Sequence, residues 1–215
     1  LKYDLDYKIS PNFGLDIPME QISKGNGESC VLSAYSSSVI NLSNHFTTSL
    51  GITAQYFTLN KNWTVEPRAA LKWTFNPKHA LALAYGLHSR RERLDYYFVE
   101  QEVNGKTESN RYLNFSKAHH FGLTYDWNIN SYMHLKVEPY YQYLFRIPVE
   151  ENSSFSIINH QSFYLDRTLK NRGSGVNYGI DITLEQYMKN GFYYMITASL
   201  FKSRYKAGDH IWRNT

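Results

Sequence analysis

The sequence predicts an all-β chain, an antiparallel meander of long strands that forms part of the wall of a transmembrane β-barrel. Three observations predict this fold class. Apolar and polar residues alternate with a period of two along most of the 215 residues, as in strands whose two faces meet different surroundings. The alternating stretches reach about 15 residues, whereas strands of soluble sheets average about five or six. Short and long connections alternate along the chain, as they do in barrels that cross a membrane.

Bulk composition is compatible with this fold. The formal net charge is +4 and the mean hydropathy is -0.51, but a barrel strand turns only every second residue toward lipid, so its average resembles that of a soluble protein. The absence of an apolar run of about 18 residues excludes only a transmembrane helix. Aromatic residues make up 16% of the chain, a share that suits water–lipid borders or stacking on carbohydrate. The single cysteine, Cys30, has no partner in the chain for a disulfide.

The alternation predicts about nine long strands. We expect them at residues 1–9, 30–42, 46–56, 65–75, 80–87, 120–127, 133–147, 176–185 and 192–200. Long connections are expected at 11–29, 88–115 and 149–172, and shorter turns near residues 43, 60, 77, 129 and 190. With nine strands, the two ends of the wall would lie on opposite sides of the membrane.

The strand at 1–9 alternates Leu, Tyr and Ile with Lys and Asp, and it ends before a loop at 11–29 that is rich in Gly, Pro and polar residues. Three consecutive serines blur the two faces of the strand at 30–42. At 46–56 apolar residues oppose Thr, Ser and Gly, and at 65–75 they oppose Glu, Arg and Lys. Each of these strands therefore has one face suited to an apolar medium.

A tight Asn-Pro-Lys turn leads to the strand at 80–87, where Leu and Tyr oppose Ala and Gly. After a polar stretch, Phe, Leu, Tyr and Trp alternate with His, Gly, Thr and Asp at 120–127. The strand at 133–147 separates an apolar face from a largely polar one, and we expect its Leu135 near the middle of the bilayer. The connection that follows has room for a short hairpin at 155–165.

The last two predicted strands, 176–185 and 192–200, flank a Lys-Asn-Gly turn. Aromatic residues gather near the short turns, where they would form a ring at one membrane border: Trp73, Phe75, Trp127, Tyr132, Phe192 and Tyr194. A strand of about 13 residues, tilted by about 40°, rises on the order of 33 Å, which is enough to cross the apolar band.

The soluble alternative is a large antiparallel sandwich or propeller, whose strands also alternate. Turn signals in a sandwich recur every 8 to 12 residues, and those of this chain lie farther apart. Two prolines count against a closed barrel instead. Pro67 and Pro139 fall within strands, at lipid-facing positions. A closed barrel has no edge strand on which a missing N–H could go unpaired, so we expect a local bulge at each proline.

Several segments together resemble the barrel of TonB-dependent outer-membrane receptors of the Bacteroidetes type. The similarity covers most of the chain from about residue 40, and it rests on the order and spacing of these motifs: VEPRAAL at 65–71, LAYGLH at 83–88, LNFSKAHH at 113–120, the pair Tyr140-Tyr141, GSGVNYGID at 173–181, TASLFKSRY at 197–205 and WRNT at 212–215.

The resemblance implies a 22-stranded barrel around an N-terminal plug, driven by an inner-membrane TonB complex. Neither the plug nor a TonB box is expected in this chain, so residues 1–215 would be a single barrel segment, the C-terminal part of a larger protein in the Gram-negative outer membrane. Expected partners are outer-membrane lipid and lipopolysaccharide, the plug of the same polypeptide, the TonB complex and a surface lipoprotein.

Charged residues on the polar faces are expected to line a water-filled or plugged interior, where they pair with neighbouring strands or with the plug. These lumen-facing candidates include Glu66, Arg68, Lys72, Lys136, Glu138, Arg146, Asp181 and Glu185. Substrate-binding candidates lie in the long connection at 88–115, because loops on a rigid barrel carry its recognition chemistry. They are Arg90, Arg91, Arg93, Tyr96, Tyr97 and Tyr112. These side chains can stack on sugars or pair with carboxylates and phosphates of a substrate. The alternative is that they contact lipopolysaccharide phosphates or are merely solvated.

The sequence predicts no enzyme, metal site or cofactor. His119 and His120 point to opposite faces of one strand and cannot chelate one ion together, and His88 with Asp95 lacks the third group of a catalytic triad. Scattered cations do not predict nucleic-acid binding. The leading hypothesis is a TonB-dependent transporter that imports a scarce nutrient, such as an iron chelate, a cofactor, an oligosaccharide or a peptide. The alternative is an outer-membrane platform for surface lipoproteins or secretion machinery.

Overall fold

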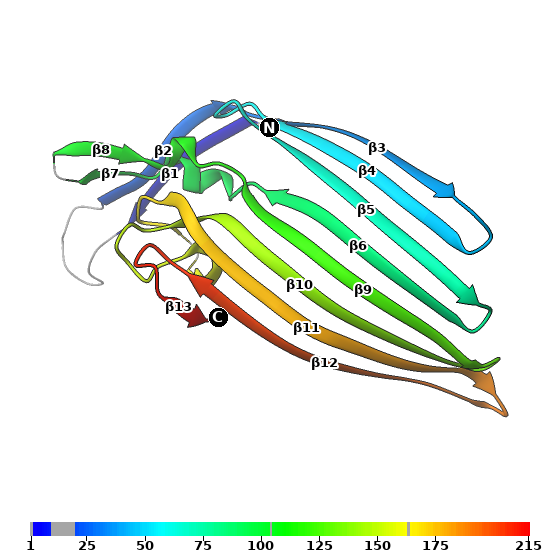
Figure 1. Ribbon diagram of the computed structural model, residues 1–215. Helices are drawn as coiled ribbons and strands as arrows, with labels where there is room; N and C mark the ends of the chain where they lie inside the picture. The colour runs from blue at the N-terminus through cyan, green and yellow to red at the C-terminus, as the bar shows by residue number, and fades with distance from the viewer. Residues whose placement is uncertain (1, 10–19, 104, 163) are drawn as a thin grey trace.

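The computed structural model describes residues 2–9, 20–103, 105–162 and 164–215. Within these residues the chain is almost entirely strand, with three short 3-10 helices. Figure 1 shows one broad, curved layer of long strands, with the remaining elements gathered at one of its ends. No helix in the described part of the chain is long and apolar enough to cross a membrane.

The broad layer is a nine-stranded antiparallel sheet whose order, from one edge to the other, is β13-β12-β11-β10-β9-β6-β5-β4-β3. Its strands are β3 (Val31–Asn41), β4 (Phe46–Phe57), β5 (Asn62–Asn76), β6 (His79–Arg90), β9 (Ser116–Asn130), β10 (Met133–Val149), β11 (Lys170–Lys189), β12 (Phe192–Lys206) and the short β13 (Trp212–Asn214). Every strand predicted from residue 30 onward is present, so the predicted all-β meander of a barrel wall is confirmed.

Connections alternate in length as predicted. Residues 42–45, 77–78, 131–132 and 190–191 form short turns at one end of the sheet, the turn end. The opposite, loop end carries the long connections at 91–115 and 150–169 and a shorter one at 58–61. Both chain termini also lie at the loop end in Figure 1. The expectation that the ends of the wall lie on opposite sides is therefore wrong.

The reason lies in the N-terminal strand. β1 (Lys2–Ile9) pairs with β2 (Glu20–Glu28) in a separate two-stranded sheet at the loop end, so the wall holds eight long strands. The loop expected at 11–29 is thus partly a strand, since alternating small and polar residues in β2 gave no apolar face to recognise. Residues 10–19 of that expected loop lie outside the described residues.

One face of the sheet, the outer face, is apolar and uncovered. Leu83 and Ile196 are each 59% exposed and Leu200 is 72% exposed, and no second layer packs on them in the part of the chain that the structure describes. Such a surface is stable against hydrocarbon and unfavourable in water. Leu135 pairs with Trp127 and therefore lies near a border of this surface, whereas Leu83 pairs with Leu123 in its middle. The predicted central position of Leu135 is wrong.

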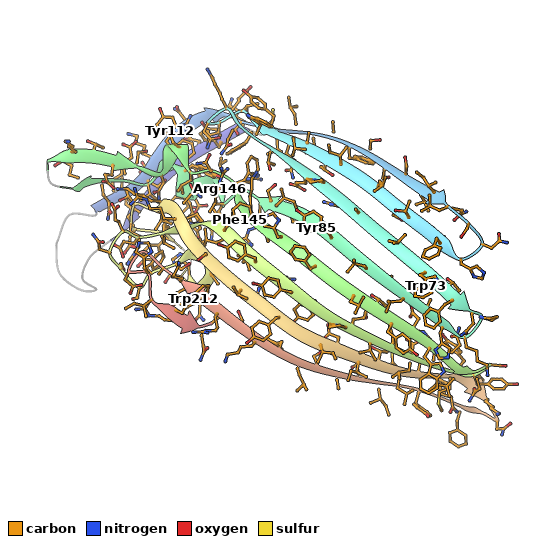
Figure 2. The ribbon with its side chains drawn as sticks, in the orientation of Figure 1. Trp73, Tyr85, Tyr112, Phe145, Arg146 and Trp212 are labelled. Carbon is orange, nitrogen blue, oxygen red and sulfur yellow. The ribbon has the colours of Figure 1, made fainter. Side chains whose placement is uncertain are left out.

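Aromatic rings mark both borders of the outer face. At the turn end, Phe46 stacks on Trp73 at 5.8 Å, Trp73 contacts Phe75 at 5.0 Å, and the contacts continue to Trp127 through His79. Trp73 is seen at this end in Figure 2. The sequence did not predict a second belt nearer the loop end, where Tyr85, Phe121, Tyr141 and Tyr178 occupy paired positions on successive strands.

Neither strand proline produces the expected bulge. Pro67 pairs in register with Ile52 of β4, and the pairing of β5 with β6 begins one residue later, at Arg68. Pro139 pairs in register with Ile180, while the pairs between β10 and β9 skip residues 138–139. Each proline therefore lies beside a position where one neighbouring strand is not paired, so its missing N–H does not interrupt a continuous ladder of hydrogen bonds.

A register shift does occur at Arg146, whose φ is 54°. Strict alternation placed Arg146 on the inner face and Ile147 on the lipid face. The extra residue instead turns Ile147 into the buried core at the loop end, where it is 4% exposed, and leaves Arg146 exposed. Bulges re-aim side chains in this way at barrel rims.

Candidate ligand-binding site at the loop end

The loop end has its own hydrophobic core, which we call the loop layer. Its buried members come from β4, from the connection at 91–115 with η1 (Leu94–Phe98), from the end of β10, and from the connection at 150–169: Phe57, Tyr96, Tyr97, Phe98, Val99, Leu113, Phe115, Ile147, Ile157, Leu165 and Leu169. The apolar run LDYYF explains why η1 packs inward. The hairpin of β7 (Glu100–Val103) and β8 (Lys106–Ser109) extends from this layer, and η2 (Asn110–Tyr112) follows it.

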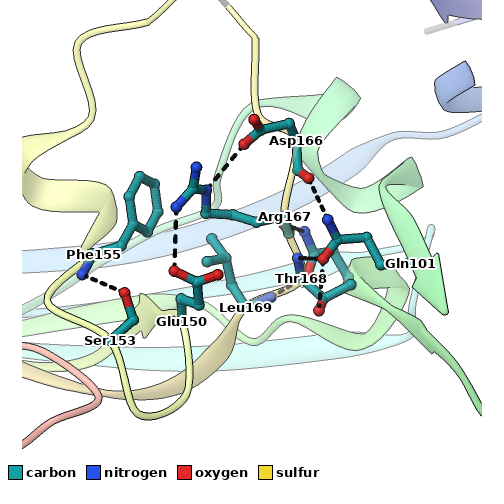
Figure 3. A network of polar contacts seen from close by, with 9 residues as sticks. Gln101, Glu150, Ser153, Phe155, Asp166, Arg167, Thr168 and Leu169 are labelled. Atoms are coloured by element: carbon teal, nitrogen blue, oxygen red, sulfur yellow. Dashed lines mark hydrogen bonds and ion pairs between the residues drawn. The ribbon is translucent and has the colours of Figure 1, made fainter. Parts of the chain in front are cut away.

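Polar contacts tie the two long connections to each other. Asn110 is fully buried; its side-chain amide donates to the carbonyl of Arg167 at 3.0 Å, and its side-chain oxygen accepts from the Leu169 N–H at 2.6 Å. Arg167 in turn pairs with Glu150 and Asp166, and its guanidinium lies 4.5 Å from the ring centre of Phe155. Figure 3 shows this network, with Gln101 bridging to Thr168. The connections therefore form a fixed surface.

The predicted hairpin at 155–165 is wrong. In its described residues that connection holds η3 (Ile157–Asn159) and two isolated bridges, one from Ser156 to Val149 and one from Glu151 to Gly208. The side chain of Ser156 caps η3 by accepting from the Ile158 N–H, which favours a turn of helix over a strand. Through η3, His160 is brought against the other long connection.

A pocket of about 550 Å³ opens between the two connections. Arg90, Arg91, Arg93 and Tyr96 line it from one side, as four of the six predicted substrate-binding residues. Glu92 lies between these arginines, and Ile157 and His160 complete the wall from the second connection. No local sequence pattern predicts a role for His160, because its position depends on a contact between segments about 65 residues apart.

The arginines are held at different strengths. Arg93 makes two hydrogen bonds to Asp95, at 3.1 and 3.0 Å, and stacks over Tyr96 at 5.1 Å. Arg90 lies 3.6 Å from the buried carboxylate of Glu92, which also accepts from the Ser116 hydroxyl at 2.5 Å. Among the described residues Arg91 donates only to the backbone carbonyl of Glu92, at 3.5 Å, and its guanidinium lies over the ring of Phe57. Its guanidinium is therefore the one most available to a ligand carboxylate or phosphate.

His160 adds a polar atom without a partner. The imidazole of His160 packs edge-on against two aromatic rings, with its centre 5.7 Å from that of Tyr96 and 5.5 Å from that of Phe155. Among the described residues no group hydrogen-bonds to its Nε2, although this atom is buried. Unsatisfied buried polar atoms are uncommon and often indicate a missing ligand or water. A bound group with oxygen acceptors would satisfy it.

The other two predicted residues do not line the pocket. Tyr97 is 1% exposed and belongs to the core, where its hydroxyl accepts from the Glu92 N–H at 3.2 Å. Burial raises the pKa of Tyr97 to about 12, so this hydroxyl stays neutral at ordinary pH. Tyr112 is 79% exposed and does not line the pocket; Figure 2 shows it at the loop end. Tyr97 is therefore a residue of the core and not of the pocket wall.

On the inner face, several predicted lumen-facing charges pair within the wall. Glu66 is buried and accepts from Gln55, Ser89 and Arg68. Lys136 pairs with Glu138 at 2.7 Å, and Glu185 lies 3.9 Å from His134. Lys72 and Asp181 form no ion pair within 4.0 Å among the described residues; Lys72 lies in the row of Thr47 and Ala82, and Asp181 in that of Glu138 and Ser199.

Arg68 also borders a shallow hollow of about 490 Å³ on the inner face. His88, His120 and Gln142 line it, over a floor of small residues on β4, β5, β6 and β9. His120 contacts His88 at 4.5 Å, whereas the neighbouring His119 contacts Phe145 of the outer aromatic belt at 4.9 Å. The two histidines therefore face opposite sides of the wall, as the alternation predicts.

No protein-family model matches the chain, and no curated protein matches it. Among solved structures it is similar to the FrpB iron transporter from Neisseria meningitidis: the F3-3 variant gives a TM-score of 0.61 at 13% identity over 85% of this chain and 27% of that chain. The F5-1 variant, as apoprotein, gives 0.59 at 12% identity over 84% and 27%.

The RagAB peptide importer in its closed-closed state gives a TM-score of 0.61 at 14% identity, over 88% of this chain and 23% of that chain. The chain thus spans about a quarter of the length of these transporters. At such low identity the likeness establishes the fold alone: this chain has the architecture of part of a β-barrel wall.

Proposed function

We propose that this chain is part of a TonB-dependent transporter of the Gram-negative outer membrane that imports a scarce nutrient. The observation that carries the proposal is the likeness of its wall to those of an iron transporter and a peptide importer, over 85% and 88% of the chain. A plug from the same polypeptide, the TonB complex and a surface lipoprotein are the partners that this function requires or commonly uses. The wall itself supplies scaffold, binding surface and conduit, and no catalysis.

The pocket at the loop end supports a more specific substrate. Three arginines and the imidazole of His160 line a space of about 550 Å³, and among the described residues the buried Nε2 of this imidazole has no hydrogen-bond partner. Carboxylate and phosphate groups accept hydrogen bonds from such donors, and the side chains of Tyr96 and Ile157 in the same pocket suit an apolar part of the same molecule. The proposed nutrient therefore carries at least one anionic group, as an acidic peptide or a carboxylate iron chelate does.

The test uses the full-length protein in cells that lack the native copy. Growth and uptake are measured with one nutrient of each class: ferric citrate, cobalamin, an acidic oligosaccharide and an acidic peptide. One of the anionic nutrients is expected to depend on the protein and on an active TonB complex. Arg91→Gln and His160→Phe should each weaken its binding by about tenfold or more, since a charge-assisted hydrogen bond contributes about 1.5 to 3 kcal/mol.

Lys24→Gln, which removes a positive charge on β2 outside the pocket, serves as the matched control and should leave binding unchanged. Uptake that is independent of TonB would contradict the transport proposal. Normal uptake of every nutrient in cells without the protein, together with loss of a surface lipoprotein from the membrane, would instead support the platform function.

A further inference from the structure

The outer face carries a second feature that substrate import does not explain. β12 alternates apolar residues on this face from Phe192 to Leu200, and the same alternation then continues with Lys202, Arg204 and Lys206. The strand register fixes their orientation. Lys202 pairs with Tyr178 and Arg204 with Val176, and directly paired residues project from the same face of a sheet. Three cations thus follow each other up the lipid-facing side of one strand, about 7 Å apart.

The length of β12 gives their height relative to the membrane. Lys202 lies eight residues from Tyr194 at the turn end, a rise of about 20 Å for a strand tilted by about 40°, and the apolar band is about 25 Å tall. Lys202 is therefore just inside the headgroup border, Arg204 is at it and Lys206 is beyond it. A long cationic side chain at this level reaches phosphate without entering hydrocarbon.

These cations have no acidic partner among the described residues. The nearby carboxylates are already engaged: Glu151 pairs with Lys170 and Arg172, and Asp209 pairs with Arg213. The contacts that Arg204 and Lys206 do make are with the indole of Trp212 on β13, at 5.6 and 5.7 Å from the ring centre. Trp212, seen beside the end of β12 in Figure 2, holds both side chains along the outer face.

We propose that Lys202, Arg204 and Lys206, with Trp212 as their support, bind the phosphate groups of a membrane lipid at the loop-end border of the barrel. The inference rests on the outer-membrane location given above, which makes the phosphorylated glycolipid of the outer leaflet the occupant. Lipid phosphates are the anions present at that height, and Trp212 offers an apolar face to the glycolipid's sugar rings or upper acyl chain. The role is to anchor the wall in its leaflet, and it is separate from the pocket between the loops.

The experiment compares full-length protein, extracted from outer membranes in mild detergent, with the variant K202Q/R204Q/K206Q. Bound lipid is identified by mass spectrometry after extensive detergent washing, and affinity is measured by adding back diphosphorylated lipid A. Affinity should fall on the order of 100-fold in the variant, if each cation near the lipid surface contributes independently. The triple variant K24Q/K61Q/K106Q removes the same charge at the loop end but away from this face, and it should bind like the wild type.

Three results would overturn the proposal: equal lipid retention by K202Q/R204Q/K206Q, equal binding of dephosphorylated lipid A, or displacement of the lipid by an equimolar amount of inorganic phosphate. The last result would identify a site for free anions instead. Shifted gel migration of the unheated protein shows that each variant is folded. Nutrient uptake is measured in parallel, so loss of lipid binding with normal uptake separates this proposal from the transport proposal.

Discussion

The effect of a substitution on the stability of this wall depends on the medium that the side chain meets. Leu123 lies in the middle of the outer face, paired with Leu83, whereas the adjacent Thr124 lies on the inner face and donates to Glu138 at 3.4 Å. The two positions share a strand, a height and nearly the same backbone, so they isolate the effect of the face.

Leu123→Arg is expected to destabilise the full-length barrel by about 2 to 4 kcal/mol, the cost of a cation at the midplane of the bilayer. Thr124→Arg should change stability little, because the new guanidinium meets the lumen and can pair with Glu138. Urea unfolding of the protein in lipid vesicles measures both. Equal costs at the two positions would mean that the outer face does not contact hydrocarbon.

Residue chemistry in the pocket was only partly readable from the sequence. A cluster of arginines and tyrosines within eight positions includes Arg90, Arg91, Arg93 and Tyr96, which line one pocket in the structure, while their role in substrate binding stays a prediction. Tyr97 is indistinguishable from Tyr96 in the sequence because a 3-10 helix has no two-residue period. Both rings are buried, and only the packing shows that Tyr96 borders the pocket. His160 depends on a contact between two connections, which no local pattern contains.

Among the elements, the pairing of β10 with its two neighbours shows how closely the strands approach. Tyr140 lies between Gly122 of β9 and Gly179 of β11 on the inner face. A Cβ at Gly179 would lie 2.6 Å from the carbonyl oxygen of Leu200 and 2.9 Å from the Tyr140 hydroxyl, whereas a Cβ at Gly122 would meet nothing within 4 Å. The Tyr140 side chain thus leans over one glycine and leaves the other open.

Gly179→Ala should therefore destabilise the barrel by about 1 to 3 kcal/mol, because β12 must shift to admit the methyl group. Gly122→Ala should be neutral or stabilise it by about 0.4 to 1 kcal/mol through the lower entropy of the unfolded chain. Midpoints of thermal conversion to the heat-denatured gel band compare the two variants. A larger loss at Gly122 would contradict the described position of Tyr140.

The alternation predicted all eight wall strands and placed both ends of β3 and β4 to within one residue, but it missed other ends, such as the start of β11. β11 runs six residues earlier than its predicted start, because Lys170 to Gly175 lack an apolar face while still pairing with β10. β2 was missed for the same reason, and the shift at Arg146 was invisible because a bulge changes the register without changing the composition. Backbone pairing, which is independent of side-chain polarity, decides these cases.

At the scale of the whole molecule, the even number of long strands places all long connections and both termini at one end. If the long connections are extracellular, as is usual in outer-membrane barrels, Cys30 at the start of β3 faces the outside of the cell. Cys30 is exposed and free, which makes it a natural reporter.

A membrane-impermeant maleimide should label Cys30 on intact cells, and Cys30→Ser should abolish that labelling. In the same Cys30→Ser background, Ser131→Cys at the turn between β9 and β10 should be labelled only after the cells are lysed. The reverse pattern would show that the barrel has the opposite orientation. Labelling of both positions on intact cells would show that the chain does not span the membrane.

The return of the wall to its starting side has a consequence for how such proteins can change over evolutionary time. A block from β3 to β12 crosses the bilayer an even number of times, so its gain or loss as a unit leaves the direction of every later strand unaltered. Barrels of different circumference can then arise by duplicating or deleting hairpin pairs, with no need to invert the remaining polypeptide.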